Sequence, residues 1–411
     1  MNIEDEYRKI EHWMKLWKKQ KEYQECLLEH YKKFFLRFKA LFLYGGGHDA
    51  PLLVDFLEDV FLDREVFFID SNPEKHGKEV YKGIVCYGPE KIVEYNPNTS
   101  IVIIATSKYA NEINDELCGS PWEVGSNNLL NRWGWNGRVE KNFVELLVNY
   151  QGGLKENVKA WMNQRHLLEI INWFDDKESL EIFSARFLFS MTGIPIPPKC
   201  SSDVQYFPIA IKSRLSKEEV FLDCGAYIGD TVKMFRNYTG DRFKAIYSFE
   251  LSDSNFNKLL ESNAIKDSRI MIIHSGIGDK NCKIKYCEEE GHESSVTCDF
   301  PNESVKDSFA KAGLLHAGRI LTVDSLVEDG GIKEPVTFVK MDIEGSELAA
   351  LRGMKCLIQR DKPKLAICVY HKPEDILEIP SYIHSLVPEY RLFLRHHSNM
   401  MTETVLYAYV E

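Results

Sequence analysis

An acidic residue and several small residues follow an apolar strand in the segment EVFLDCGAYIGDT. Glycines let the backbone approach a ligand closely, and a carboxylate accepts hydrogen bonds from an ammonium group. The segment therefore predicts a loop that binds a cationic ligand, such as the amino-acid end of S-adenosylmethionine, better than a pyrophosphate. A plain tight turn between a strand and a helix is the alternative. The candidate cofactor-binding residues here are Asp223, Gly225, Ala226, Gly229 and Thr231.

Two further strand ends carry residues suited to the same ligand. Glu250 ends the apolar run IYSFE, where a carboxylate can bind both hydroxyls of a ribose. The next strand is followed by SGIGD, so that Gly276 and Gly278 are expected beneath an adenine and Asp279 is expected to reach its amino group. A simple glycine turn would explain the last segment equally well.

A third group of acidic residues lies in KMDIEGSELAAL. Asp342 closes an apolar strand, where a carboxylate is costly unless it pairs, binds a metal or takes a proton. Glu347 is explained by its place at a helix N-terminus, where acids favour the helix dipole. Together with Glu344 these acids could hold a divalent cation, but oxygen ligands alone do not favour that interpretation, and no metal site is predicted.

Methyl transfer to a hydroxyl requires an in-line approach and removal of a proton, so a positioned base is expected. Asp342 and His371 are the two candidates, because His371 ends the strand in AICVYH and should lie on the same sheet edge as the ligand. A histidine at a strand end is as often a surface or core residue, which leaves the identity of the base open.

The elements that must position these residues alternate between strands and helices from residue 201 to 411. Apolar runs predict strands at 220–222, 245–249, 270–274, 338–341, 365–369, 390–394 and 404–410, with helices beginning at Asp230 and Asp253. Such alternation is typical of an α/β fold with a doubly wound, mainly parallel sheet. The prolines of IPIPPKCSSD separate this domain from the preceding part of the chain.

The first half of the chain divides into three predicted segments. Residues 1–39 form an amphipathic helix, 40–120 form a small Rossmann-like domain, and 121–200 form a helical connector. The helix is expected to dock on its own domain or on a twin subunit, and a membrane surface or an acidic partner is the alternative. In the small domain a strand at 40–44 runs into Gly45, Gly47 and Ala50, and Asp70 ends the next strand, 66–69, about where a ribose-binding acid would stand. This is a loose match to a dinucleotide-binding pattern. A further strand is predicted at 101–105.

Composition excludes several function classes. The 411 residues carry a formal net charge of -11, which argues against a nucleic-acid partner. The ten cysteines are dispersed without a C-x-x-C pair and are interpreted as free thiols, not as a zinc site. The charged N-terminus and the absence of a long apolar run predict a cytoplasmic protein with no transmembrane segment.

The region from about residue 205 to 410 resembles the FkbM family of methyltransferases. The carrying segments are VQYF, EVFLDCGAYIGDT, IYSFEL, LTVDSL, FVKMDIEGSELAALRGM, AICVYHKPEDI and LRHHSNMMTETVLYAYV. The resemblance implies a class I methyltransferase fold, S-adenosylmethionine as cofactor and a sugar or natural-product hydroxyl as acceptor. Leu251 stands where the family commonly has proline after the acid, a departure that should leave the ribose contact intact.

Two other interpretations of the chain remain open. The first is a nicotinamide-dependent oxidoreductase built on the N-terminal domain, for which Tyr87 and Lys91 have the spacing of a catalytic pair. Gly88 and Pro89 between them indicate a turn instead of a shared helix face. The second is a non-catalytic binding protein that uses the cofactor fold as a scaffold, against which the complete set of acids and glycines argues.

Overall fold

The structure is a computed structural model that describes residues 3–17, 29, 33, 35–36, 38–45, 54, 64–96, 99–104, 129–130, 167–192, 198–287, 315–398 and 402–411. Its contacts divide the chain into two compact units. One contains Met1–Leu167, Leu180–Cys200 and Ser398–Met401, and the other contains Leu168–Ser179, Ser201–His397 and Thr402–Glu411. The predicted cofactor-binding and catalytic residues all belong to the second unit.

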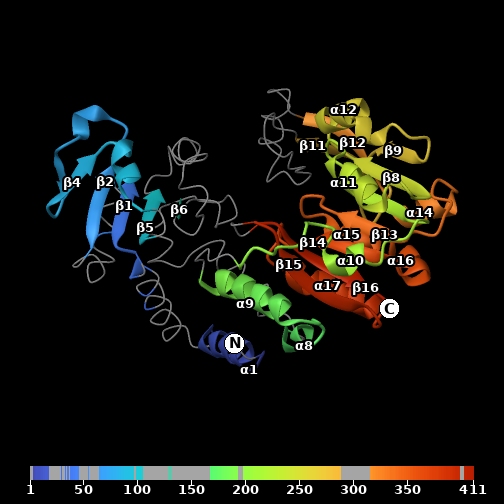
Figure 1. Cartoon of the computed structure of the whole chain (residues 1–411), viewed down its shortest axis with the longest axis horizontal. Coiled ribbons are helices and arrows are strands. Elements are labelled where there is room, and N and C mark those ends of the chain that lie inside the picture. Colours follow the sequence, from blue (N-terminus) through green and yellow to red (C-terminus); the bar gives the residue numbers. More distant parts are fainter. Residues whose placement is uncertain are drawn as a thin grey trace. The chain divides into compact units, whose positions relative to one another are not determined.

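The first unit contains a six-stranded sheet with the order β3-β4-β2-β1-β5-β6 (Figure 1). Its β1 pairs in parallel with β2 and β5, and the pairs β2 with β4 and β5 with β6 are also parallel. The strands predicted from residues 40, 66 and 101 are confirmed. The strands are β1 (Ala40–Tyr44), β2 (Glu65–Ile69), β3 (Glu79–Tyr81), β4 (Ile84–Tyr87), β5 (Ser100–Ile104) and β6 (Leu129–Leu130).

The hairpin of β3 and β4 was not predicted from the sequence. Lys82 and Gly83 join the two strands, and both have a positive φ, at 47° and 81°. Two such residues in succession suit a tight hairpin turn. Tyr87 ends β4 and Lys91 lies in the 3-10 helix η2 (Pro89–Glu94), so the two residues do not share a helix, as the turn signal predicted.

Asp70, the predicted ribose-binding acid of this unit, is engaged by its own loop. Its carboxylate accepts a hydrogen bond from the backbone N–H of Asn72 at 2.9 Å and pairs with Lys75 Nζ at 2.5 Å. The short 3-10 helix η1 (Pro73–Lys75) follows. Gly47 and Ala50 lie outside the described residues, so the dinucleotide-binding pattern stays a prediction.

Helices account for most of the other described residues of the first half. The helix α1 (Ile3–Trp17) buries Ile10 and Trp13, and α8 (Leu167–Ile171) and α9 (Lys177–Thr192) lie within the predicted connector. Residues 18–28 and 131–166, for which helices were also predicted, lie outside the described residues. Among the described residues, no helix combines the length and the apolar character needed to cross a bilayer.

The second unit contains a seven-stranded sheet with the order β15-β16-β14-β13-β7-β8-β9 (Figure 1). Neighbours from β14 to β9 are parallel, whereas β16 is antiparallel to both β14 and β15. The predicted doubly wound α/β fold is confirmed. The strands are β7 (Val220–Cys224), β8 (Ala245–Glu250), β9 (Ile270–His274), β13 (Phe338–Met341), β14 (Lys364–Cys368), β15 (Arg391–His396) and β16 (Thr404–Tyr409).

The helices of this unit form two groups. Helix α11 contacts the 3-10 helix η6, while α14 contacts α16, and α17 contacts both α15 and α16. Strand order reverses between β7 and β13, and right-handed crossovers then place the two groups on opposite faces of the sheet. The helices are α10 (Ile209–Lys212), α11 (Asp230–Thr239), α12 (Asp253–Glu261), η6 (Asn263–Ile265), α14 (Val323–Glu328), α15 (Glu347–Arg352), α16 (Lys355–Asp361) and α17 (Asp375–Leu386).

A small three-stranded sheet adjoins the end of β9. Its order is β10-β12-β11, formed by β10 (Gly276–Ile277), β11 (Cys282–Cys287) and β12 (Leu315–Leu321). The antiparallel pairing of β11 with β12 does not follow from a local sequence pattern. His292 and Cys298, which come after β11 in the sequence, lie outside the described residues.

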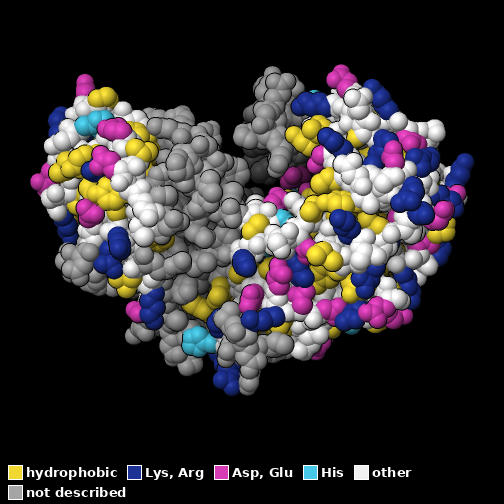
Figure 2. Space-filling model, viewed as in Figure 1, with side chains coloured by type: hydrophobic (Ala, Val, Ile, Leu, Met, Phe, Trp, Pro, Cys, Tyr) yellow, Lys and Arg dark blue, Asp and Glu magenta, His cyan; other side chains and the backbone are white. Residues whose placement is uncertain are grey.

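The described surface combines both charge signs with a few exposed apolar side chains. Figure 2 shows Lys and Arg interspersed with Asp and Glu over the part of the described surface in view. Tyr227 and Ile228 are exposed by 41% and 38%, and both belong to the predicted ligand loop. Apolar groups at a ligand loop suit a surface that a bound molecule covers.

The central core of the second unit rests on stacked phenylalanines. Phe221 stacks on Phe235 of α11 with ring centroids 4.5 Å apart and on Phe338 of β13 at 5.0 Å. We expect Phe235→Ala to lower the free energy of unfolding by about 3–5 kcal/mol, because it leaves a cavity between helix and sheet. Leu260→Ala, at a position 49% exposed, should change it by less than about 0.5 kcal/mol. Urea denaturation of both variants measures the difference, and equal losses would contradict this packing.

Candidate active site

A cavity of about 380 Å³ opens at the carboxyl ends of the central strands of the second unit. It lies where strand order reverses between β7 and β13, the position at which α/β sheets commonly bind ligands. Its volume falls in the range of small-molecule sites, about 300–1,000 Å³. Of the predicted residues, the cavity is lined by Gly225, Thr231, Glu250, Gly276 and Asp342.

The loop after β7 is held tightly against its neighbours. The backbone N–H groups of Gly225 and Ala226 both donate to the carbonyl oxygen of Phe249, at 3.0 and 2.9 Å. Gly225 has a φ of 82°, and a Cβ atom there would lie 2.0 Å from the carbonyl oxygen of Asp342. Gly229 begins α11 with a φ of 87°. The predicted glycine loop therefore brings backbone close to backbone at the switch point.

A buried lysine ties this loop to the next strand. Lys340 is 3% exposed, and its Nζ donates to the carbonyl oxygen of Gly225 at 2.6 Å and lies 3.4 Å from Asp223 Oδ1. Burial raises the pKa of Asp223 to about 7, although Lys340 opposes the shift. Burial by itself would lower the pKa of Lys340, but Asp223 and Asp342 raise it, and the ammonium group stays charged.

Asp223 lies behind the loop and is not among the residues that line the cavity. Its side chain is fully buried, and neither carboxylate oxygen accepts a hydrogen bond within the described residues. Ala226 and Gly229 do not line the cavity either. Asp223, Ala226 and Gly229 thus belong to the loop without lining the cavity, whereas Gly225 and Thr231 line it.

Glu250 ends β8 at the cavity wall, as predicted. Its Oε2 accepts a hydrogen bond from the N–H of Tyr227 at 2.8 Å and its Oε1 accepts one from the N–H of Ser252 at 2.9 Å. Burial raises the pKa of this carboxyl, although the two N–H groups oppose the shift. Each oxygen keeps a second lone pair for a ligand hydroxyl.

The segment after β9 fits the prediction only in part. Gly276 lines the cavity, next to Ser275 and Ile277. Gly278 is buried instead, and a Cβ there would lie 2.6 Å from Cγ2 of Ile320. Its carbonyl oxygen also packs against Gly353, 1.9 Å from where a Cβ of Gly353 would stand. Asp279 is exposed and is absent from the cavity lining. A sequence pattern of two glycines cannot tell a ligand contact from a backbone contact.

Asp342 also lines the cavity, directly after the end of β13. Its Oδ2 accepts a hydrogen bond from the Tyr206 hydroxyl at 2.7 Å, and its Oδ1 accepts one from Tyr370 at 3.4 Å. Burial alone would raise the pKa of Asp342, but Lys340, His371 and Tyr206 together lower it below its usual value. The carboxylate is therefore charged and oriented at neutral pH.

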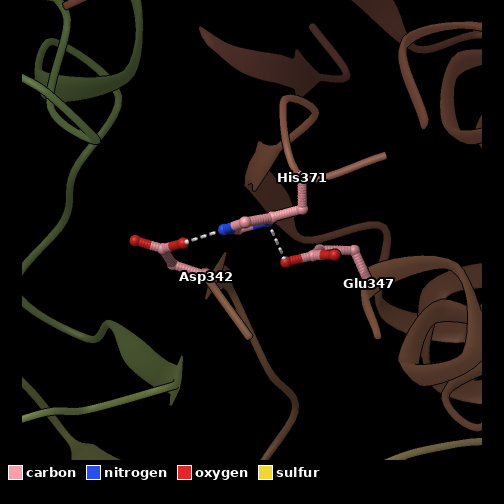
Figure 3. A group of neighbouring side chains, drawn as sticks. All are labelled: Asp342, Glu347 and His371. Atoms are coloured by element: carbon pink, nitrogen blue, oxygen red, sulfur yellow. Dashed lines mark ion pairs between the residues drawn. The ribbon is translucent and has the colours of Figure 1, made fainter. Parts of the chain in front are cut away.

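His371 follows β14 and lies among three carboxylates, of which Figure 3 shows those of Asp342 and Glu347. Its Nε2 is 3.4 Å from Asp342 Oδ1 and 3.6 Å from Glu344 Oε2, and its Nδ1 is 2.9 Å from Glu347 Oε1. Burial would lower the pKa of His371, but the carboxylates of Glu347, Asp342 and Glu344 raise it to about 9. His371 and Asp342 lie together at one edge of the sheet, as predicted. Because the pKa of His371 is raised above neutral pH, its imidazole already carries a proton at pH 7.

Several cavity residues were not singled out from the sequence. They are Gln205, Tyr206, Tyr227, Asn255, Lys340, Tyr370 and Glu403. Lys340 could have been found from the sequence, because it is a charged residue inside the otherwise apolar strand FVKM. Tyr206 and Glu403 reach the cavity from segments far from the acids in sequence, and no local pattern indicated them.

The arrangement combines two sets of polar groups in one cavity. Glu250 and the Gly225 loop can hold a ligand with hydroxyl and amino groups, while Asp342 can orient a hydroxyl and accept its proton. Both sets line the same cavity, so a ligand on the first would lie close to a molecule bound at the second. The site therefore suits group transfer between two bound molecules.

Part of the chain is similar to known proteins. Residues 223–398 match the family model of the methyltransferase FkbM domain. The methyltransferase FkbM of Methylobacillus flagellatus KT is similar in structure, with 22% sequence identity, a TM-score of 0.52 and 92% of each chain covered. No curated protein matches the chain.

Two solved structures with bound S-adenosyl-homocysteine are more distant. A putative methyltransferase of Streptococcus mutans in complex with SAH has 12% identity and a TM-score of 0.29, and the match covers 48% of this chain and 93% of the other. TrmK of M. capricolum, also with SAH, has 10% identity and a TM-score of 0.26, with coverage of 50% and 68%. The Methylobacillus flagellatus structure supports the fold assignment, whereas these two structures are too distant to support it further.

The contact of Gly225 with Asp342 can be tested against a matched glycine. Gly330 also has a positive φ, 73°, but among the described residues no atom beyond its own chain neighbours lies within 4 Å of the position that a Cβ would take there. We expect Gly330→Ala to cost about 1–2 kcal/mol of backbone strain, and Gly225→Ala to cost about 1–3 kcal/mol more because the end of β13 must move. Urea denaturation measures both. If the two variants were equally stable, the loop and β13 would not be in such close contact.

Proposed function

Because residues 223–398 form a methyltransferase domain of the FkbM family, we propose that this chain transfers the methyl group of S-adenosylmethionine to a hydroxyl oxygen of a sugar or glycan. The observation that carries the proposal is the single cavity that both Glu250 and Asp342 line. A cofactor bound at Glu250 would present its methyl group to an acceptor held at Asp342.

The cofactor is assigned to the wall formed by the ends of β7, β8 and β9. The carboxylate of Glu250 binds the ribose hydroxyls, and the backbone of the Gly225 loop binds the methionine part. Leu251, Ile277 and Ile320 supply an apolar surface for the adenine. Asp223 acts from behind the loop by holding Lys340 beneath Gly225.

The acceptor is assigned to the wall around Asp342. Tyr206 and Tyr370 flank this carboxylate, and Gln205 donates to Glu403 Oε2 at 2.6 Å in the same lining. Aromatic faces interleaved with hydrogen-bonding groups suit a sugar, which presents both C–H faces and hydroxyls. The exposed side chain of Tyr227 adds a further aromatic surface at this cavity.

The transfer is a single displacement in line with the bond that breaks. The acceptor oxygen attacks the methyl carbon, the carbon–sulfur bond breaks, and its electron pair stays on the sulfur. The hydroxyl proton passes to Asp342 and then to solvent. The products are a methyl ether, S-adenosyl-homocysteine and one proton.

Cofactor binding tests the first part of the proposal. We expect S-adenosylmethionine and S-adenosyl-homocysteine to bind with micromolar affinity in calorimetric titration, and NAD(H) not to bind. Glu250→Gln should weaken binding about tenfold or more, because hydrogen bonds to a charged group are lost. Glu261→Gln, on the exposed end of α12, should bind normally. A folded wild-type protein that does not bind either sulfur ligand would refute the cofactor assignment.

Turnover tests the role of Asp342. We expect Asp342→Asn to lower kcat about a hundredfold or more, since a general base contributes at least this factor, and to change the Kd of the cofactor little. The measurement is S-adenosyl-homocysteine release with sugar acceptors found by screening. Asp279→Asn, exposed and outside the cavity, is the control. An Asp342→Asn variant with normal turnover would show that the acid is structural.

A further inference from the structure

Asp342 and Glu347 lie in the segment that leads from β13 into α15, His371 follows β14, and the three side chains point toward one another (Figure 3). One oxygen of each carboxylate and one ring nitrogen of the histidine all lie within 4.8 Å of one another. Donors that share a metal ion stand about 2.0–2.4 Å from it and therefore at most about 4.8 Å apart. The spacing of the three side chains fits a single ion.

The same three side chains contain buried polar atoms without hydrogen bonds. The His371 side chain is 9% exposed and that of Glu347 is fully buried. Within the described residues, the two ring nitrogens of His371 make no hydrogen bond, and neither does Oε2 of Glu347. Their close contacts are thus ion pairs without hydrogen-bond alignment. Buried polar atoms are nearly always paired, so these atoms indicate a missing partner.

The charges around the cluster point to a cation as that partner. Asp342, Glu344 and Glu347 place three carboxylates around one imidazole. Like charges at this spacing repel strongly in a buried site. The protonated imidazole offsets one of them, whereas a divalent ion that displaces this proton offsets two. A ring nitrogen and carboxylate oxygens together form a mixed donor set that first-row transition metals accept.

We propose that Asp342, Glu347 and His371 bind one divalent first-row transition-metal cation at the edge of the cavity. Asp342 lines the cavity, so an ion held by its carboxylate would lie at the edge of the cavity. The role of the ion in the reaction rests on the proposed function, whereas its binding does not. In that role the ion would lower the pKa of an acceptor hydroxyl bound to it, and the Asp342 oxygen that does not bind the ion would accept the proton.

Direct Mn²⁺ binding tests the site on the whole chain without any acceptor. The protein is stripped with a chelator and titrated with Mn²⁺, and free Mn²⁺ is measured by electron paramagnetic resonance, with Zn²⁺ and Mg²⁺ as competitors. We expect one Mn²⁺ bound per chain, displaced more readily by Zn²⁺ than by Mg²⁺. Absence of Mn²⁺ binding by the folded wild-type protein at millimolar concentration would overturn the proposal.

Variants locate the ion. Glu347→Gln and His371→Gln should weaken Mn²⁺ binding about tenfold or more, in line with the loss of one ligand. His316→Gln is the matched control, because His316 lies 3.0 Å from Asp253 in a comparable ion pair outside the cluster. Equal affinities in all three variants would overturn the assignment. Titration of the metal-free protein with S-adenosyl-homocysteine separates the two proposals, since the cofactor wall does not include the cluster.

Discussion

The structure of the site depends on the burial of one positive charge. Lys340 points its ammonium group from β13 into the loop that follows β7, where it meets the carbonyl oxygen of Gly225 and the carboxylate of Asp223. A buried charge is tolerated only when it is paired, so the loop and the strand must keep this arrangement. The ends of β7 and β13 are thereby held together, and with them the two walls of the cavity.

The parts of the site that the sequence predicts are those encoded by local pattern. Apolar runs set the strands, and the first polar residue after each run sets the strand end, which is why Asp223, Glu250, Asp342 and His371 all lie at the carboxyl edge of the sheet. Parallel strands share that edge, so acids distant in sequence meet there. The glycine at position 225 is likewise fixed by its positive φ and its contact with β13.

Contacts between distant segments account for what the sequence could not predict. Tyr206 reaches Asp342 across 136 positions, and nothing near either residue indicates that hydrogen bond. Gly278 looks like a ligand glycine but packs against Gly353, and Asp279 beside it faces solvent. The antiparallel insertion of β16 between β14 and β15 also depends on pairing that local apolar content does not specify.

The central claim is that a cofactor occupies the wall of Glu250 with its reacting sulfur directed at Asp342. A crystal structure of the protein with S-adenosyl-homocysteine tests it most directly. The account predicts that the ribose hydroxyls contact Glu250, that the methionine part lies over the Gly225 loop, and that the sulfur faces Asp342 across the cavity. A ligand bound outside this cavity, or with its sulfur turned away from Asp342, would contradict the account.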